Sequence, residues 1–213
     1  MEKVSAPERA ASPVMDCFAL LQEPRRPWVD PDSLKAGFLR LAARVHPDKV
    51  QQAGANERYA ELNAAYHCLL DPKQRLRHLL ELESGATPKD VQSIPPGTMD
   101  LLVEIGQVCR ETDLFLAARS NTVSPLLKVR MFETGMAWAG KLNQLRRRID
   151  SRREELVAEL KGMNAAWNAA PPPGSAGRAA ALPLERLEQV SRVFSYTARW
   201  TEQIQERLVQ LSI

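Results

Sequence analysis

The residues with the clearest potential for chemistry are His46, Pro47, Asp48 and Lys49, which follow one another directly. They place an imidazole and a carboxylate on the two sides of a proline, between two segments with helical periodicity. Taken alone, such a tetrapeptide is a turn that ends a helix, because proline disfavours helical geometry in the residue before it. Any further meaning must come from the segments on either side.

The segment before this turn has a cationic side. It carries Lys35, Arg40 and Arg44, and the last two are one helical turn apart. The apolar residues of the same segment recur at three-and-four spacing and fall on another side; they are Leu34, Phe38, Leu41, Ala42 and Val45. A cationic helical face therefore leads to a tight, exposed loop with an imidazole and a carboxylate. The competing interpretation of these cations is a solvated helix face, since surface charges usually contribute little.

The linear sequence contains no motif typical of a metal or cofactor site. Cys17, Cys68 and Cys109 are far apart and form no C-x-x-C pair. The histidines His46, His67 and His78 have no ligand spacing for zinc, and there is no Gly-rich phosphate loop. We therefore expect no cofactor and no metal, and interpret the cysteines as isolated reduced thiols of a cytoplasmic protein.

The charge balance does not favour nucleic acid. The chain has 213 residues, with 29 Lys+Arg against 26 Asp+Glu and a formal charge of +3. One basic run contains Arg146, Arg147, Arg148, Arg152 and Arg153. Acidic residues are interleaved with it, namely Asp150, Glu154, Glu155 and Glu159. This alternation is typical of a salt-bridged, exposed helix.

The elements that must position the turn are helices. Strand signals are nearly absent, whereas helical periodicity recurs along the chain. Asp30 and Pro31 are an N-cap acid and a first-position proline for the helix before the turn. A second helix follows the turn and ends near Asp71 and Pro72. No apolar run approaches the roughly 20 residues that span a bilayer, so we expect no membrane partner. Residues 1–14 lack a secretory apolar region and are expected to form a flexible tail.

The second half of the chain predicts a bundle. Residues 85–97 hold three prolines and two glycines without periodicity and are interpreted as a linker. Beyond it, three long amphipathic patterns must cover one another's apolar stripes. Residues 169–183, rich in Ala, Pro and Gly, are expected to be a flexible surface loop. The predicted fold is all-α: a small helical domain at 15–84, the linker, and a three-helix bundle at 98–213.

Residues 15–78 resemble a J domain, the module by which DnaJ-type co-chaperones engage an ATPase chaperone of the DnaK type. The resemblance rests on DCFALL at 16–21, FLRLAARV running into HPDK at 38–49, and LNAAYHCLLDP at 62–72. It implies a helical hairpin whose basic helix docks by charge complementarity, and whose His-Pro-Asp loop biases the chaperone toward ATP hydrolysis. The protein itself is then not an enzyme.

The resemblance also implies roles for single residues. His46 and Asp48 correspond to the trigger, and Pro47 to the rigid bend. The cations that correspond to the steering face are Lys35, Arg40, Arg44 and Lys49.

The segment after Asp71 narrows the resemblance. General DnaJ proteins continue into a Gly/Phe-rich stretch and a Cys-rich zinc module, and neither occurs here. Residues 71–85 lead instead into the helical bundle, a plan that resembles HscB, the co-chaperone of iron–sulfur cluster assembly. The resemblance is strong to residue 85 and weak in the bundle, where 166–170 and 203–208 match best.

In the HscB family the bundle holds a cluster scaffold of the IscU type, through an apolar and acidic patch on its first helix and a cation-plus-apolar pair on its last. By position, the patch falls on Leu102, Val103, Gly106, Gln107 and Arg110, and the pair on Arg192 and Val193 with Phe194 beside it. Gly106, Gln107 and Arg110 depart from the family's large apolar residue and acids, so either the partner differs or the register is shifted by a turn. Leu102 and Phe194 equally fit the bundle core.

The sequence thus predicts a co-chaperone that stimulates a DnaK/HscA-type ATPase and delivers an IscU-type scaffold. Two alternatives stay open at this point. The bundle serves another client, or the chain is an interaction protein with a degenerate J domain. The packing of the two parts against each other is also open.

Overall fold

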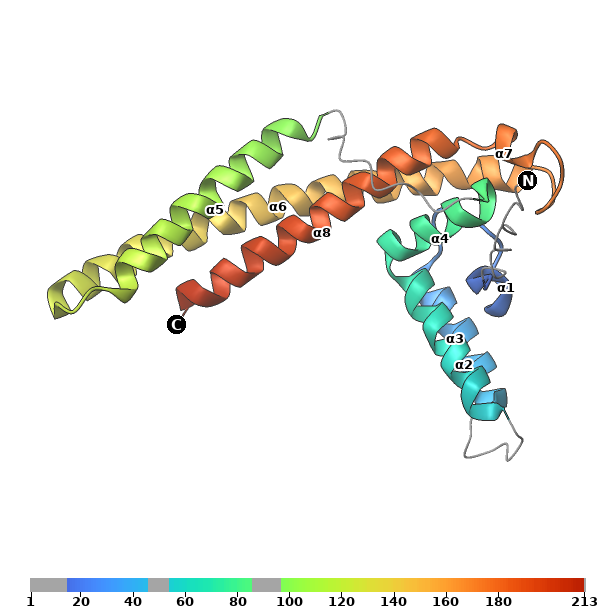
Figure 1. Ribbon diagram of the computed structural model, residues 1–213, viewed down its shortest axis with the longest axis horizontal. Coiled ribbons are helices and arrows are strands. Elements are labelled where there is room, and N and C mark those ends of the chain that lie inside the picture. Colours follow the sequence, from blue (N-terminus) through green and yellow to red (C-terminus); the bar gives the residue numbers. More distant parts are fainter. Residues whose placement is uncertain (1–14, 46–53, 86–96, 213) are drawn as a thin grey trace, which may run out of the picture.

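A computed structural model describes residues 15–45, 54–85 and 97–212 (Figure 1). All regular secondary structure in these ranges is α-helical, which confirms the predicted all-α fold. Figure 1 shows a long helical bundle with a smaller group of helices packed against one of its ends. The expected tail at 1–14, most of the expected linker and the His46–Lys49 turn lie outside the described residues.

The smaller group consists of α1 (Cys17–Leu20), α2 (Pro31–Val45), α3 (Ala55–Leu70) and α4 (Pro72–Ser84). The predicted boundaries are confirmed where proline and aspartate meet. Asp30 accepts a hydrogen bond from the Ser33 amide at 2.9 Å, and α2 starts at Pro31. Asp71 ends α3 and caps α4 through the Lys73 amide. Because these caps satisfy amides that a helix start leaves unpaired, they fix where each helix begins.

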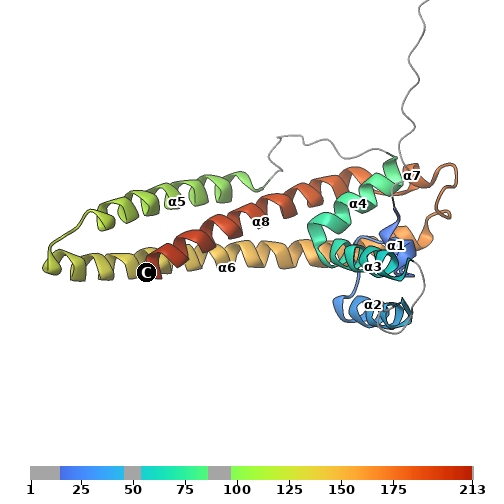
Figure 2. The same ribbon diagram turned by 60° about the horizontal axis from the view of Figure 1, so that its bottom comes forward.

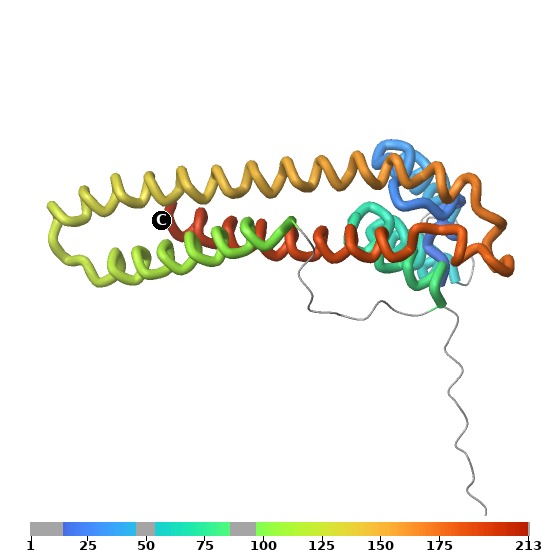
Figure 3. The backbone as a smooth tube through the Cα atoms, turned by 90° about the horizontal axis from the view of Figure 1, so that it is seen from above, coloured from blue at the N-terminus to red at the C-terminus, as the bar shows by residue number. Residues whose placement is uncertain are grey.

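The bundle consists of α5 (Met99–Ser120), α6 (Pro125–Ala169) and α8 (Leu184–Ser212). The α6 helix has 45 residues and is about 68 Å long, since an α-helix rises about 1.5 Å per residue. Figure 3 shows α5 and α8 along α6 from opposite ends, overlapping only in its middle part. The second of the three predicted amphipathic patterns covers the apolar residues from Leu142 to Trp167, whereas α6 begins at Pro125. Near its N-terminus α6 pairs with α5 alone, and its apolar side chains there do not form a single buried stripe.

The two parts share one hydrophobic core. Buried residues of α1 to α4, such as Phe18, Leu69 and Leu79, belong to the same cluster as Leu160 of α6 and Leu187 of α8. Figure 2 shows α4 between α3 and α8, and α4 contacts both. A second cluster lies further along the bundle and consists of Ile105, Cys109, Leu142, Leu145, Ile149, Trp200 and Ile204. The question that the sequence left open is thereby answered, because the small domain packs directly on the bundle.

Polar contacts reinforce this junction. The Asn164 side chain on α6 accepts from the Trp28 amide at 3.0 Å and donates to the Trp28 carbonyl at 2.9 Å. The Lys161 ammonium lies 4.8 Å from the centre of the Trp28 ring. Arg75 is buried and donates to the carbonyls of Pro27 and Leu69, and burial lowers its pKa to about 10. The segment between α1 and α2 is therefore tied both to α6 and to the start of α4.

The segment 169–183 differs from the expected flexible surface loop. It contains the short helix α7 (Arg178–Ala181), and Arg178 is buried. Its guanidinium pairs with both carboxylate oxygens of Glu83 on α4, at 2.7 and 2.8 Å, and also donates to the Pro171 carbonyl. The hydrogen bonds to Glu83 raise the pKa of Arg178. A composition rich in Ala, Pro and Gly could not reveal this long-range ion pair.

Within the part of the chain that the structure describes, no helix combines the length and the apolarity that a membrane crossing requires.

The buried ion pair generates a stability prediction. Glu83→Gln keeps the shape of the side chain but leaves the Arg178 charge uncompensated, and should reduce the free energy of unfolding by about 3–5 kcal/mol. The measurement is urea denaturation followed by circular dichroism. Glu154→Gln, at an exposed position on α6, is the matched control and should change stability by less than about 0.5 kcal/mol.

A double variant separates charge from shape. Glu83→Leu with Arg178→Met removes both charges and should recover most of the lost stability. Equal stability of Glu83→Gln and the control would contradict the role given to this pair.

Candidate functional site

The basic face of α2 is positioned by the packing of its opposite side. Phe38 is buried and stacks on Tyr66 of α3, with ring centroids 4.6 Å apart. This contact turns Lys35, Arg40 and Arg44 outward, and all three side chains are exposed. The predicted separation of an apolar and a cationic side on this helix is therefore confirmed.

The end of α2 adjoins a groove. A depression of about 280 Å³ opens between α1, α2 and α3, and is lined by Leu20, Leu41, Arg44, Val45, Arg58, Glu61 and Leu62. Its lining combines apolar side chains with the charged Arg44, Arg58 and Glu61. Because Val45 is the last residue of α2, the groove lies immediately before the His46–Lys49 turn. Arg44 in the last helical turn also compensates the negative end of the helix dipole. The turn itself lies outside the described residues.

The predicted patch on α5 has one exposed side. Val103 is 57% exposed, and Gln107 and Arg110 are exposed along the same helix face. Leu114, a further turn along this face, is 73% exposed. Gln107 donates to Glu111 at 3.0 Å. Leu102 is half-buried and packs against the second core cluster, so its side chain belongs mainly to the bundle interior.

Gly106 lies inside this face. A Cβ atom at Gly106 would lie 3.4 Å from the Arg110 guanidinium, so the small residue leaves room for that cation. Two of the departures from the HscB pattern, Gly106 and Arg110, are therefore adjacent in space.

Two residues of the predicted set on α8 are buried. Val193 and Phe194 are only 4% and 3% exposed and lie in the core shared with α1 to α4. Arg192 is half-buried and pairs with Glu188 at 2.6 Å. Phe194 therefore follows the core interpretation, and Val193 is equally unavailable to a partner. The two predicted client segments contribute to different core clusters and are not brought together.

A different cation of α8 lies beside α5. The Arg207 guanidinium pairs with Asp113 of α5 at 2.6 Å and donates to the Cys109 carbonyl at 3.3 Å. The pair with Asp113 raises the pKa of Arg207. The match at 203–208 was the available signal for this residue, but periodicity does not tell which helix its side chain meets.

Sequence reasoning missed an exposed apolar region at the far end of the bundle. It is called here the distal apolar tip, and each of its residues is at least half exposed: Leu114, Val123, Leu126, Leu127, Val129, Phe132 and Met136. Leu211 near the end of α8 lies opposite Gly135, so α8 ends close to the level where this region begins. The available signal was that apolar residues occur on several sides of the helix at 125–136.

The basic run on α6 has acidic partners. Arg148 pairs with Glu104 of α5, and Arg152 pairs with Glu155 at 2.6 Å. These contacts support the interpretation of a salt-bridged helix.

Comparison with known proteins identifies the N-terminal part. Residues 16–78 match the family model of the DnaJ domain. This segment is a J domain. It is 45% identical over 58 residues to the chaperone protein DnaJ of Acaryochloris marina, which is 27% of this chain and 16% of that protein. It is 49% identical over 49 residues to the DnaJ of Prochlorococcus marinus, 23% of this chain and 13% of that protein. The chain thus matches only the J domain, a small fraction of the length of these relatives.

The J domain and the bundle together have a known fold. The crystal structure of human co-chaperone protein HscB superposes with a TM-score of 0.56, covering 96% of this chain and 93% of that one at 17% identity. The predicted plan, a J domain followed by a helical bundle of the HscB kind, is therefore confirmed at the level of the fold.

The register of α2 generates a second prediction. Phe38→Ala removes the ring that stacks on Tyr66 and should reduce the free energy of unfolding by about 3–5 kcal/mol. Its neighbour Leu39, 55% exposed, is the matched control, and Leu39→Ala should cost less than about 0.5 kcal/mol. Urea denaturation of both variants gives the comparison. A larger loss for Leu39→Ala would mean that the basic side of the J domain faces another way.

Proposed function

We propose that this protein is a J-domain co-chaperone that stimulates ATP hydrolysis by a DnaK/HscA-type chaperone and presents to it an IscU-type iron–sulfur scaffold protein. The observation that carries the proposal is the exposed basic face of α2, which leads directly into His46, Pro47 and Asp48 in a J domain. The HscB fold of the whole chain supports the choice of client.

The proposed action on the chaperone is a shift in its conformational equilibrium. Lys35, Arg40 and Arg44 are exposed together and give an acidic chaperone surface a complementary field, which speeds and orients encounter. The His46–Asp48 turn then contacts the conformation that hydrolyses ATP better than the conformation that does not. Only such a difference in contacts can shift the equilibrium.

The proposed client surface is the exposed side of α5 together with the distal apolar tip. Exposed apolar surface of this kind on a monomer is typical of a protein interaction site. Val103 and Leu114 supply apolar contacts, and Arg110 between them supplies a cation for an acidic group on the client. This placement replaces the pair at Val193 and Phe194, whose side chains are buried.

The shared core couples the two proposed activities, stimulation of the chaperone and binding of the client. The J domain is packed on α6 and α8, so a client bound to the bundle is held at a defined position relative to the basic face. Delivery then requires no movement between the two parts, and the entropy of a flexible connection is avoided.

The experiment for the chaperone side is single-turnover ATP hydrolysis by a DnaK-type chaperone. The wild-type protein should stimulate hydrolysis, and His46→Gln should return it to the basal rate. Arg40→Glu with Arg44→Glu should raise the half-maximal concentration by on the order of 10-fold at low salt and by less at high salt. Arg147→Glu, at an exposed position on α6, is the matched control and should have no effect. Absence of wild-type stimulation, with a chaperone that responds to another J protein, would contradict the proposal.

The experiment for the client side uses the full chain and a purified IscU-type scaffold. Val103→Asp with Leu114→Asp should weaken binding at least roughly 10-fold, because a carboxylate replaces an apolar contact in the interface. Ala158→Asp, at an exposed position on α6, should leave binding unchanged. Calorimetry measures the affinity, and circular dichroism checks that helicity is retained. No binding by the wild-type chain would assign the bundle to another client.

A further inference from the structure

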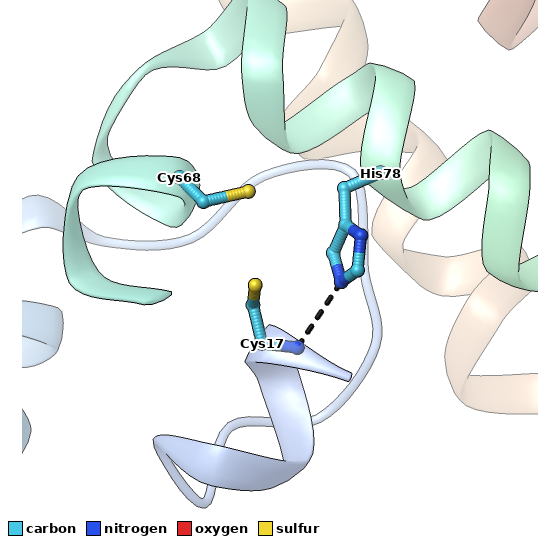
Figure 4. Close-up of side chains that lie close together, drawn as sticks. All are labelled: Cys17, Cys68 and His78. Atoms are coloured by element: carbon cyan, nitrogen blue, oxygen red, sulfur yellow. Dashed lines mark hydrogen bonds between the residues drawn. The ribbon is translucent and has the colours of Figure 1, made fainter. Parts of the chain in front are cut away.

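Two cysteines and a histidine from three helices converge inside the J domain. Cys17 is the first residue of α1, Cys68 lies in the last turn of α3, and His78 lies within α4. The two sulfur atoms and one ring nitrogen all lie within 4.8 Å of one another. Figure 4 shows the two sulfur atoms facing each other, with the imidazole beside them. Spacing along the chain could not reveal this set, because its members come from distant segments.

The cluster is largely enclosed. Cys17 is 5% exposed and His78 is 8% exposed, whereas Cys68 is half-buried. Phe18 is buried and stacks on the His78 ring, with centroids 6.0 Å apart and planes at 9°. The ring of His78 is thereby fixed in orientation before any ligand arrives.

The imidazole presents an unprotonated nitrogen to the cluster. The Nε2 atom of His78 accepts a hydrogen bond from the Cys17 backbone N–H at 3.1 Å. An accepting Nε2 carries no proton, and its electron pair is directed at the Cys17 N–H. A neutral imidazole nitrogen is the form in which histidine binds metals. A bound ion would take this electron pair at the cost of one buried backbone hydrogen bond.

The two thiols differ in acidity. The hydrogen bond from Cys17 lowers the pKa of Cys68, and the same hydrogen bond, with burial, raises the pKa of Cys17. Thiolate is the form of cysteine that binds metals.

We propose that Cys17, Cys68 and His78 form a binding site for a thiophilic d10 metal ion, Zn²⁺ or Cu⁺. Two thiolates and one imidazole are donors that both ions favour. Each thiol that binds releases its proton to solvent, and no oxidation is involved. Three protein ligands complete a trigonal Cu⁺ site, whereas Zn²⁺ needs a fourth ligand.

A metal here would fasten α1 to α3 and α4. The α1 helix has only four residues and cannot be stable by itself, so it depends on such tertiary contacts. The metal would thus stabilise the part of the J domain that borders the groove beside the end of α2, where Leu20 of α1 lies. This inference is independent of the chaperone and client proposed above.

The test uses the full chain, purified metal-free under a reductant that does not bind metals. Zn²⁺ and Cu⁺ are titrated separately against a chromophoric chelator for each ion. We expect one equivalent of at least one ion to bind. Cys17→Ser and Cys68→Ser should each weaken binding at least roughly 100-fold, and His78→Gln at least roughly 10-fold.

Cys109→Ser is the matched control, because Cys109 is a buried cysteine of α5 outside the cluster. It should bind like the wild type. A second readout keeps the test valid if a cysteine variant is less stable. Saturating metal should raise the Tm of the wild type and of Cys109→Ser but not that of Cys68→Ser. Stoichiometric binding that survives Cys68→Ser, or no stoichiometric binding of either ion, would overturn the site.

Discussion

The position of α4 is the constraint on which the rest of the structure depends. This helix has α3 on one side and α8 on another, and Leu76 and Leu79 are fully buried between them. Burial of apolar surface is the main favourable term in folding, and here one helix contributes it to two substructures at once. The Glu83–Arg178 pair closes the end of the same helix. Without the other, neither the J-domain helices nor the end of the bundle that packs on them would keep a complete core.

This shared core gives a physical reason for combining a J domain and a bundle in one chain. Under the proposed function, a J domain on a flexible tether would hold a client only at an average distance from the chaperone, whereas a packed J domain fixes both distance and direction. The exposed side chains divide accordingly. Cations gather on α2, and apolar residues gather on α5 and at the distal apolar tip. One end of the molecule is suited to electrostatic encounter and the other to burial of apolar surface.

Much of the local structure was predictable, because local structure has local causes. The Asp30–Pro31 and Asp71–Pro72 pairs set helix boundaries through capping, and the periodicity of Phe38 and Leu41 identified the buried side of α2. The fold class followed from such signals, whereas the J domain was predicted from the resemblance of residues 15–78 to that family. Periodicity indicates that a side chain is buried, but it does not identify the element against which the side chain packs. Val193 and Phe194 were assigned to a client through the resemblance, although they pack toward α1 to α4.

The features that were missed depend on long-range contacts. Arg178 meets Glu83 across 95 positions of sequence, and Cys17 meets His78 across 61. No local pattern encodes such pairs. The start of α6 was not predicted because it has few packing partners. A helix of this kind has no single apolar stripe for periodicity to detect.

The unbroken α6 helix fixes how the two ends of the molecule are rotated relative to each other about the helix axis. Each residue of an α-helix turns the chain by about 100° and advances it by about 1.5 Å. Between Trp167, in the shared core, and Phe132, at the tip, α6 contains no break. The direction in which the distal apolar tip faces, relative to the basic side of α2, therefore depends on the number of α6 residues between Phe132 and Trp167. Exposed side chains along α6 can vary without changing this orientation, but a one-residue insertion or deletion would rotate the tip against the basic side of α2 by more than a quarter of a turn.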